Sequence, residues 1–455
     1  MPPNPNTFAP FERRAVMSLA GLYSFRMLGL FMVLPVLALY GRDYTGSTPL
    51  LLGVALGAYG LSQALLQIPF GMLSDRIGRK PVIVGGLLIF ALGSVVAAQA
   101  ETVYGLIFGR ALQGAGAIAS AIMALVADLT SEQNRTKAMA AIGMSIGASF
   151  SLALVLGPLV TKVAGLEGVF WLTALFATLG VWIILRLVPT PHRLPYTHRD
   201  AGTVPQLLRE TLRHRELMRL NLGIFALHFV LMASFVVLPV VLEDQLGVGR
   251  DWHWAVYLPL LLLAFVAMVP FIIIGERKQK MKPVFVGAIV LLGAMELLLV
   301  VGQQSLSLTL VALFFFFMAF NLLEASLPSL ITKMAPAGSK GTASGIYSTC
   351  QFLGAFGGGV LGGWWLDGGN ASDVFLGCAA LLLVWALVAA FMERPRHLSS
   401  VLVSVADDDL DAAELRLRSL AGVEEVVLIE EERVAYLKVD GQRFDRGDLA
   451  SIGLA

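Results

Sequence analysis

Four ionisable side chains lie inside long apolar stretches of the sequence: Arg26, Arg110, His228 and Glu324. A charge near the centre of a bilayer costs roughly 2.5–3.5 kcal/mol on insertion scales, so such residues usually face the protein interior and mark substrate, ion or proton pathways. Glu324 is the strongest candidate, because Asn321 shares its helix face at i,i+3 spacing. Surroundings of low polarity favour the neutral form of a carboxyl group, which suits a site that binds and releases a proton.

Each of these residues also has a purely structural interpretation. Arg26 could pair with a helix end or a carbonyl group, Arg110 could brace neighbouring helices, and a lone histidine such as His228 often only packs. Glu324 could form a structural pair with Arg26 or another cation. Glu296 is better explained by a buried partner or a kink than by chemistry. Three amides could line a cavity or only hold helices together; they are Gln63, Gln67 and Gln351.

The sequence offers little support for an enzyme or a nucleic-acid-binding protein. We find no nucleophile with a neighbouring base, no nucleotide-binding loop and no metal-ligand cluster, and we expect no cofactor. Cys350 and Cys378 both fall in apolar stretches, which argues against a disulfide framework or a cysteine-rich metal site. The net charge of +1 gives no reason to expect a nucleic-acid partner.

The elements that position these side chains are predicted to be membrane-spanning helices. Of the 455 residues, 57% are hydrophobic and 14% are charged, against about 45–50% and about 25% in soluble domains. A span needs about 20 apolar residues, and the apolar stretches are continuous rather than alternating. Twelve candidate spans cover residues 15–40, 49–73, 81–100, 103–128, 137–161, 167–189, 217–242, 252–274, 283–301, 307–331, 342–366 and 372–392.

Basic residues predict the orientation of these spans. With the N-terminus inside, twenty Lys and Arg residues fall on the inner side before the tail, against three outside: Arg42, Lys162 and Arg250. Because cytoplasmic loops are enriched in Lys and Arg, both termini are expected in the cytoplasm. The first span is followed directly by others and lacks a cleavage site of small residues, so it is not expected to be a signal peptide.

The spans divide into two related halves. A linker rich in proline and arginine, with a short amphipathic helix expected near 204–215, separates six spans from six. The segment Phe31–Val36 recurs as Phe235–Val240, 204 residues later, and further pairs recur at offsets of 201 to 205. Such parallel repeats are typical of transporters whose substrate lies at the midplane between halves. The predicted domains are 1–189, the linker 190–216, the second bundle 217–392 and a cytoplasmic tail 393–455.

Three motifs resemble one family. The loop after the second span reads Gly71-Met-Leu-Ser-Asp75-Arg76-Ile-Gly78-Arg79-Lys80-Pro81, and it matches the signature loop of the major facilitator superfamily. The segment Arg110–Ala117, which contains Gln113, is similar to the second motif of that superfamily. Gly29 and Pro35 have the spacing seen in its drug:proton antiporters. The whole chain, tail included, further resembles the YajR group of efflux transporters within this superfamily.

The resemblance implies an all-α membrane fold of twelve helices in two six-helix repeats. It also implies that spans 1, 4, 7 and 10 line a central cavity, which makes Arg26, Arg110, His228 and Glu324 candidates for contact with substrate. Gln113, Asn321 and Gln351 join them. In the antiporter motif of span 5, paired glycines usually follow Gly-Pro, whereas Leu159-Val160 follow Gly157-Pro158 here. The direction of transport therefore stays open at this point.

The signature loop is expected to act as a conformational latch. Gly71 and Gly78 permit close helix approach and a sharp turn, and the basic residues Arg76, Arg79 and Lys80 hold the loop inside. Topology alone does not explain an acid in this basic loop. By resemblance, Asp75 faces the start of span 11 near Gly341-Thr342 in the outward-open state, where the positive end of a helix favours a carboxylate. Arg79 and Asp128 complete the charge cluster, again by resemblance.

The tail predicts a small α+β domain. Strands are expected at 400–405, 423–429 and 434–439, helices at 411–420 and 443–452, and a hairpin at 430–433. The order βαββα resembles the ferredoxin-like fold of small heavy-metal-associated domains. Their paired cysteines are replaced by Ala406-Asp407-Asp408-Asp409, so we expect no soft-metal site. Self-association or regulatory contact is one expected role, and a passive remnant without a role is the alternative.

We therefore predict a multi-pass secondary active transporter of the bacterial inner (plasma) membrane. Its partners are a small organic substrate, protons and the lipid bilayer, and it exports the substrate by alternating access with proton coupling at Glu324. Two alternatives remain: a symporter that takes up a nutrient, and a membrane transceptor that signals through its tail.

Overall fold

The computed structural model describes residues 8–190, 205–336, 338–393, 398–405, 410–429, 434–440 and 443–445, together with 447 and 449. The N-terminal helices are α1 (Pro10–Phe31), α2 (Leu37–Tyr40), η1 (Gly41–Asp43), α3 (Pro49–Ile77), α4 (Arg79–Ala98), α5 (Val103–Ala115), α6 (Ala119–Asp128), α7 (Glu132–Arg186) and α8 (Pro205–Arg213). The second group comprises α9 (Arg215–Val240), η3 (Val241–Gln245), η4 (Arg250–Trp252), α10 (His253–Arg277), α11 (Met281–Gly302), α12 (Leu306–Met334), α13 (Lys340–Gly368) and α14 (Ala371–Ala390). The tail contains β1 (Leu398–Ser404), α15 (Leu410–Ser419), β2 (Val423–Ile429) and β3 (Val434–Asp440).

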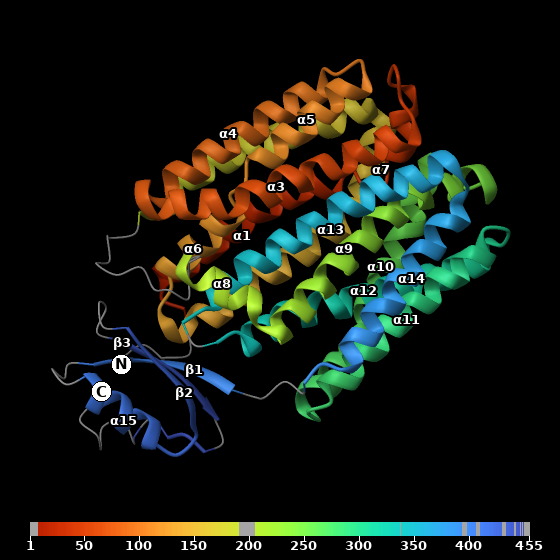
Figure 1. Ribbon diagram of the computed structural model, residues 1–455. Coiled ribbons are helices and arrows are strands. Elements are labelled where there is room, and N and C mark those ends of the chain that lie inside the picture. Colours follow the sequence, from red (N-terminus) through yellow and green to blue (C-terminus); the bar gives the residue numbers. More distant parts are fainter. Residues whose placement is uncertain are drawn as a thin grey trace.

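The protein is mostly helical, and its helices form two bundles. In Figure 1 the bundle of α1–α7 (red to yellow) lies beside the bundle of α9–α14 (green to blue), and α3 and α13 run next to each other between them. Within the described residues, nine helical segments are long and apolar enough to cross a membrane. They are α3, α4, α5 with α6, residues 137–186 of α7, α9 with η3, η4 with α10, α11, α12 and α14.

Two long helices that pack in the bundles, α1 and α13, are less apolar than these nine segments and are not among them. Their sequences explain the difference. The helix α1 carries Glu12, Arg13, Arg14 and Arg26. The helix α13 contains the glycine run from Gly354 to Gly363, in which polar backbone replaces apolar side chains.

Two of the predicted spans, 15–40 and 103–128, each consist of two helices with an interruption between them, and the second is still long and apolar enough to cross a membrane. The first breaks into a turn after Phe31 and resumes as the short helix α2. Pro35 lies in this turn, and proline cannot donate a backbone hydrogen bond. The second breaks at Gly116, whose ψ of 50° departs from the helix and whose carbonyl turns toward Arg26.

The predicted boundary between spans 5 and 6 lies inside α7, which bends there. Within α7, Ala164 and Gly165 leave helical geometry, and Gly165 has a φ of 65°. This conformation is accessible to glycine without steric cost. The chain therefore turns between two helical segments near the place where the apolar stretches separate.

The glycine run of α13 brings the two bundles into close contact with each other, as its spacing predicts. A Cβ atom added to Gly53 of α3 would overlap the carbonyl oxygen of Gly359, and one added to Gly363 would lie 2.6 Å from the carbonyl oxygen of Pro49. Small residues let helix backbones approach closely. The ends of α3 and α13 that carry these residues are consequently packed together without intervening side chains.

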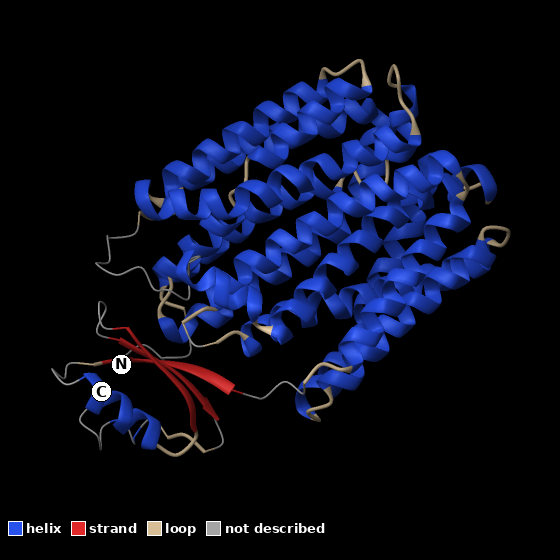
Figure 2. Cartoon of the chain, in the orientation of Figure 1, coloured by secondary structure: helices blue, strands red, loops and turns tan. Residues whose placement is uncertain are grey.

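The tail forms a three-stranded antiparallel sheet in the order β1-β3-β2 (Figure 2). The observed βαββ order agrees with the predicted strands and first helix. Ala413 and Leu417 of α15 pack with Val401, Leu437 and Val439 in one apolar core. The predicted acidic loop 406–409 and hairpin 430–433 lie outside the described residues, as does half of the second helix predicted at 443–452.

The central strand β3 is buried on both faces. Ala435, Leu437 and Val439 point into the core beneath α15, whereas Tyr436 and Lys438 are buried on the opposite face. Lys438 Nζ donates to the carbonyl oxygen of Lys333, at 3.0 Å. The sheet therefore contacts the last turn of α12, next to the segment that leads to α13.

Candidate functional site

Three helices of the second bundle bring a histidine, a glutamine and a glutamate together. Gln351 of α13 lies within hydrogen-bonding distance of both His228 of α9 and Glu324 of α12. Gln351 Nε2 is 2.8 Å from His228 Nε2 and 3.4 Å from Glu324 Oε1. Because the amide nitrogen donates, His228 Nε2 accepts and the imidazole proton lies on Nδ1. That nitrogen faces Glu324 Oε2 at 3.9 Å.

Several polar atoms around this cluster have no hydrogen-bond partner in the described part of the chain. They are His228 Nδ1, Glu324 Oε2, Asn321 Nδ2 and the hydroxyl of Tyr347. Buried polar groups are normally paired, so this arrangement leaves capacity for a proton, a water molecule or a ligand. The side chain of Glu324 is 33% exposed, against 7% for His228, although the Oε2 atom of its carboxyl group is buried.

Local sequence positions these groups. Asn321 and Glu324 are one helical turn apart on α12, and Tyr347 and Gln351 are one turn apart on α13. Phe320, next to Asn321, lies against His228, with ring centroids 6.1 Å apart. It also stacks on Phe150 of α7 at 5.7 Å. Aromatic rings from both bundles therefore cover the cluster on the side toward the start of α12.

Arg26 lies in a separate polar network of the first bundle. Its Nη2 atom donates to the hydroxyl of Tyr59 at 2.9 Å and to Gln63 Oε1 at 2.6 Å, and Gln63 in turn donates to Gln67. The Nε and Nη1 atoms of Arg26 are buried without a described partner. Arg26 and Glu324 form no ion pair in the described structure, which weighs against the structural interpretation of Glu324 as a partner of Arg26.

Arg110 and Gln113 join three helices of the first bundle. Arg110 Nη1 donates to Gln113 Oε1 at 2.8 Å, and Gln113 Nε2 donates to Ser94 Oγ at 2.8 Å. The guanidinium lies over the ring of Tyr59, 5.2 Å from its centroid. Both side chains are fully buried. The contacts favour the interpretation of Arg110 as a brace, because they fix the ring whose hydroxyl binds Arg26.

The signature loop forms the predicted charge cluster at the C-terminal ends of α3 and α6. Arg79 pairs with Asp75 and, through Nε at 3.1 Å, with Asp128. It also donates to Ser74 Oγ at 2.7 Å. Gly78 has a φ of 101°, as the sharp turn requires. Lys80 Nζ donates to the carbonyl oxygen of Val188 at 2.6 Å, whereas Arg76 is exposed.

Charged contacts at the other end of the bundles were not predicted as functional. Arg42 pairs with Asp244 at 3.0 Å, and Lys162 approaches Asp251 at 3.8 Å. Arg250 lies over the ring of Tyr40, 4.9 Å from its centroid. Each contact joins the first bundle to the second. The cations in these contacts, Arg42, Lys162 and Arg250, are the three that the count of basic residues assigned to the outer side. The sequence signal that could have predicted the two ion pairs is that each places residues of opposite charge in different repeats.

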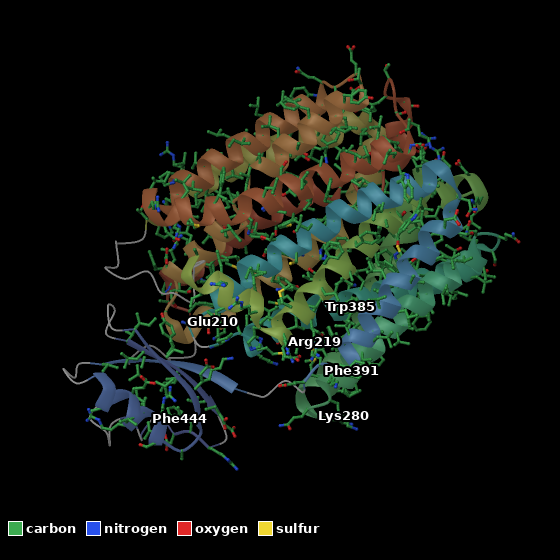
Figure 3. The ribbon with its side chains drawn as sticks, in the orientation of Figure 1. Glu210, Arg219, Lys280, Trp385, Phe391 and Phe444 are labelled. Carbon is green, nitrogen blue, oxygen red and sulfur yellow. The ribbon has the colours of Figure 1, made fainter. Side chains whose placement is uncertain are left out.

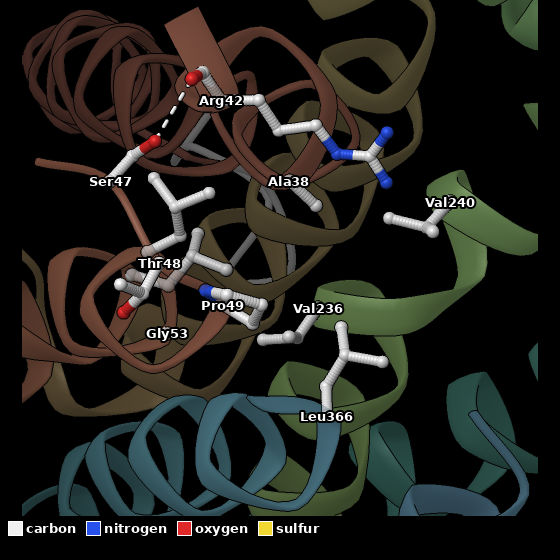
Figure 4. Close-up of a pocket in the computed structure, with 11 residues that line it drawn as sticks. Ala38, Arg42, Ser47, Thr48, Pro49, Gly53, Val236, Val240 and Leu366 are labelled. Atoms are coloured by element: carbon white, nitrogen blue, oxygen red, sulfur yellow. Dashed lines mark hydrogen bonds between the residues drawn. The ribbon is translucent and has the colours of Figure 1, made fainter. Parts of the chain in front are cut away.

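Beneath these contacts lies a pocket of about 260 Å³. Apolar side chains from both bundles line it, among them Leu56, Val236 and Leu366. Arg42 extends across the mouth toward Val240, and its carbonyl oxygen accepts a hydrogen bond from Ser47 (Figure 4). The pocket is separate from the cluster around Glu324.

Glu296 is fully buried between helices of the second bundle. Its Oε1 atom accepts a hydrogen bond from Ser234 Oγ at 2.8 Å. This is the buried partner expected from the sequence, whereas the Oε2 atom of Glu296 is buried without a described partner. Within the described residues, no group of three or more metal-ligating side chains is found.

The comparisons with known proteins agree with this fold. The profile of the Major Facilitator Superfamily matches residues 19–359 and 282–425. The chain is 48% identical over 450 residues to the inner membrane transport protein YajR of Escherichia coli strain K12, covering 98% of each chain. It is 26% identical to the multidrug resistance protein MdtH of Aeromonas salmonicida, over 81% of this chain and 93% of that protein.

Solved structures show the same fold. A bacterial homologue of the human lysosomal transporter Spinster, in an inward-facing and occupied conformation, has a TM-score of 0.64 at 15% identity, over 85% of this chain and 97% of that one. The family and these relatives are membrane transporters rather than enzymes. The chain belongs to the major facilitator superfamily and, within it, is a YajR-like multi-pass membrane transporter.

Proposed function

We propose that this transporter exports a small organic compound by alternating access and couples export to protons at Glu324. The observation that carries the proposal is the convergence of three helices on one carboxyl group with unpartnered polar atoms around it. The multidrug resistance proteins among its relatives support efflux as the direction.

The closed outer side supports a state in which the cluster is reached from the inner end. Arg42 and Asp244 bridge the bundles at the outer surface, and the glycines of α3 and α13 pack below them. The stacked rings of Phe150 and Phe320 lie next in line, just above Glu324. Opening to the outside requires three contacts to separate: the ion pair, the glycine contact between α3 and α13, and the stacked phenylalanine rings.

The hydrogen-bond donors around Glu324 suit a carboxyl group that changes protonation. When ionised, Glu324 accepts from Gln351 and faces the Nδ1 proton of His228. When protonated, it no longer needs these donors, and Gln351, His228 and Asn321 are free to contact substrate. Arg26 offers two further donors from the opposite bundle. Arg110 and Gln113 are proposed to position Tyr59 and thereby Arg26.

We propose twelve crossings with both termini in the cytoplasm. The crossings are α1 with α2, α3, α4, α5 with α6, the two parts of α7, α9, α10, α11, α12, α13 and α14. The two bundles then span 1–189 and 217–392, the linker 190–216 joins them, and α8 is the amphipathic helix predicted within it.

The tail, residues 393–455, is proposed to be a ferredoxin-like regulatory domain. It leaves the bundle at a fixed point: Arg219 Nη1 at the start of α9 donates to the carbonyl oxygen of Phe391 at 2.8 Å, and both residues lie at the end of the bundle nearest the sheet (Figure 3). Its sheet then contacts the carbonyl group of Lys333. Since α12 carries Glu324 and α13 carries Gln351, the segment that joins them is well placed for regulation.

Glu324→Gln tests the proposal, because glutamine keeps the volume and loses the titration. In proteoliposomes with an imposed pH gradient and a panel of fluorescent organic cations and anions, we expect wild-type accumulation to depend on the gradient. The variant should insert normally but lose uphill transport and its pH dependence, while downhill exchange continues. Glu296→Gln is the matched control, since it removes a buried carboxyl group outside the cluster. Full, pH-dependent transport by Glu324→Gln would contradict the proposed proton site.

The same experiment separates the two alternatives. Uptake of a nutrient would appear as accumulation in the direction of the proton gradient rather than against it. A transceptor would show tail-dependent binding of a partner without measurable flux of any compound in the panel.

A further inference from the structure

A second pocket lies at the inner end of the first bundle, away from the transport site. Its volume is about 570 Å³. The first turns of α1 supply Pro10, Phe11 and Arg14, and the end of α7 supplies Arg186, Leu187 and Val188. Two cations and several apolar groups thus share one hollow between two neighbouring helices.

In the described part of the chain, the side chains of Arg14 and Arg186 form no ion pair or hydrogen bond. The acid closest in sequence to Arg14 is unavailable: Glu12 accepts hydrogen bonds from the backbone of Ser131 and the side chain of Asn134. Lys80 already binds the carbonyl oxygen of Val188. Two exposed guanidinium groups therefore line the same pocket without a described counter-charge.

The surface beside the pocket is apolar and faces outward. Met17, one turn along α1 from Arg14, is 66% exposed, and Trp182, one turn before Arg186, is 55% exposed. Tryptophan is enriched at the boundary between lipid chains and water. The pocket therefore opens at the level of the lipid headgroups, with its apolar side continuous with the lipid-facing surface of α1 and α7.

We propose that this pocket binds the headgroup of an anionic phospholipid from the adjacent leaflet. Basic pockets between membrane helices on the cytoplasmic side are suited to such headgroups. The planar guanidinium groups of Arg14 and Arg186 match phosphate oxygens in a bidentate manner, while Phe11 and Leu187 contact the upper part of the lipid chains. The proposal places this end of the helices at the inner membrane surface, as the proposed topology does, but it does not depend on the substrate or on proton coupling.

Lipid binding here has a structural consequence for the signature loop. The carbonyl group of Val188, in the wall of the pocket, holds Lys80, and the neighbouring Arg79 carries the Asp75–Asp128 cluster. A bound headgroup would thus fix the end of α7 to which this loop is tied.

The test measures retention of phosphatidylglycerol by the full-length transporter. Protein is purified in detergent with equal amounts of phosphatidylglycerol and phosphatidylcholine, and bound lipid is counted by native mass spectrometry. We expect selective retention of phosphatidylglycerol by the wild type. Loss of a charged hydrogen bond lowers affinity about ten-fold, so Arg14→Gln and Arg186→Gln should each lower retention by about that factor. Arg13→Gln is the control, because Arg13 is exposed beside Arg14 but does not line the pocket.

Three results would overturn the proposal. Equal retention by the variants and the control would remove the pocket from lipid binding. An equal loss in Arg13→Gln would indicate general attraction to a basic surface rather than a site. For the wild type alone, thermal stabilisation by inorganic phosphate equal to that by phosphatidylglycerol would identify a site for free anions. The last measurement uses only the wild type, so it tests the proposal even if a variant folds poorly.

Discussion

Arg42 and Asp244 form an ion pair across the two bundles, 3.0 Å apart in space and 202 residues apart in sequence. That separation is close to the offset of 204 between Phe31–Val36 and Phe235–Val240. The two residues therefore follow equivalent helices of the two repeats, and the chain brings the outer ends of these helices together. The pair therefore joins corresponding positions of the two repeats.

Arg42→Gln should favour opening of the outer side. The two side chains are 43% and 47% exposed, and an exposed pair contributes about 0.2–1 kcal/mol, so the open population should rise by no more than about five-fold. A cysteine at Val240, which lines the outer pocket, would report opening by its rate of maleimide labelling. The background needs Cys350→Ala and Cys378→Ala. Asp244→Asn should raise the labelling rate by a similar factor, and the double variant should raise it little further. Additive effects of the two changes would argue against the pair.

Gly53→Ala should disturb outer closure more strongly. A methyl group at this position overlaps the carbonyl oxygen of Gly359, and overpacking of this kind costs about 1–3 kcal/mol. We expect faster labelling at the Val240 reporter and reduced transport. Gly85→Ala is the matched control, because nothing lies within 4 Å of the added carbon. Wild-type labelling of Gly53→Ala would mean that α3 and α13 separate without this contact.

Asp75→Asn should shift the balance in the opposite direction. By resemblance, the carboxylate stabilises the outward-open state at the start of α13, and a partly buried charge at a helix end contributes about 1–2 kcal/mol. We therefore expect slower labelling at Val240, less transport and nearly unchanged substrate binding. Leu73→Ala, an exposed change in the same loop, should leave labelling unaffected. An unchanged labelling rate in Asp75→Asn would exclude the latch.

Lys438→Met should release the sheet from the membrane bundle. It removes the donor to the Lys333 carbonyl while keeping an unbranched side chain on the buried face. Hydrogen exchange of residues 335–340 should accelerate by about five-fold, as expected for loss of about 1 kcal/mol. Arg418→Gln is the control, since Arg418 is exposed on α15 and pairs locally with Glu414. Equal exchange in both variants would show that the contact does not hold this segment.

Residues 398–455 should fold without the membrane bundle. The sheet and α15 share their own apolar core, which includes Val401, Ala413 and Leu437. Expressed alone, the segment should be soluble and show mixed helix and strand circular dichroism. A spectrum of disordered chain would reject an independent domain.

Sequence periodicity and composition were sufficient for elements whose signals are local. The apolar stretches, the i,i+3 pair of Asn321 and Glu324, and the strands of the tail all depend on residues close in the chain. The turn after Phe31 and the break at Gly116 were missed, because each depends on where a backbone group finds its partner. Gly116 leaves the helix where its carbonyl meets Arg26, 90 residues away.

Contacts between residues far apart in the chain could not be predicted for the same reason. His228 and Gln351 were each recognised as polar residues in apolar helices, but 123 residues separate them. Nothing in their spacing specified that Gln351 would lie between His228 and Glu324. Arg42 was counted only as a basic residue of the outer side, since its partner belongs to the other half of the chain.

The burial of β3 on both faces sets a limit on assembly of the transporter. The face that carries Tyr436 and Lys438 is occupied by contact with the bundle, so it cannot at the same time pair with the sheet of a second copy. Docking of the sheet on its own bundle and dimerisation through the same face are therefore mutually exclusive. A higher concentration of the transporter would favour dimerisation at the expense of docking. If two copies associated through this face, the contact with Lys333 would be released, and the freedom of this end of α12 would then depend on the surface density of the transporter.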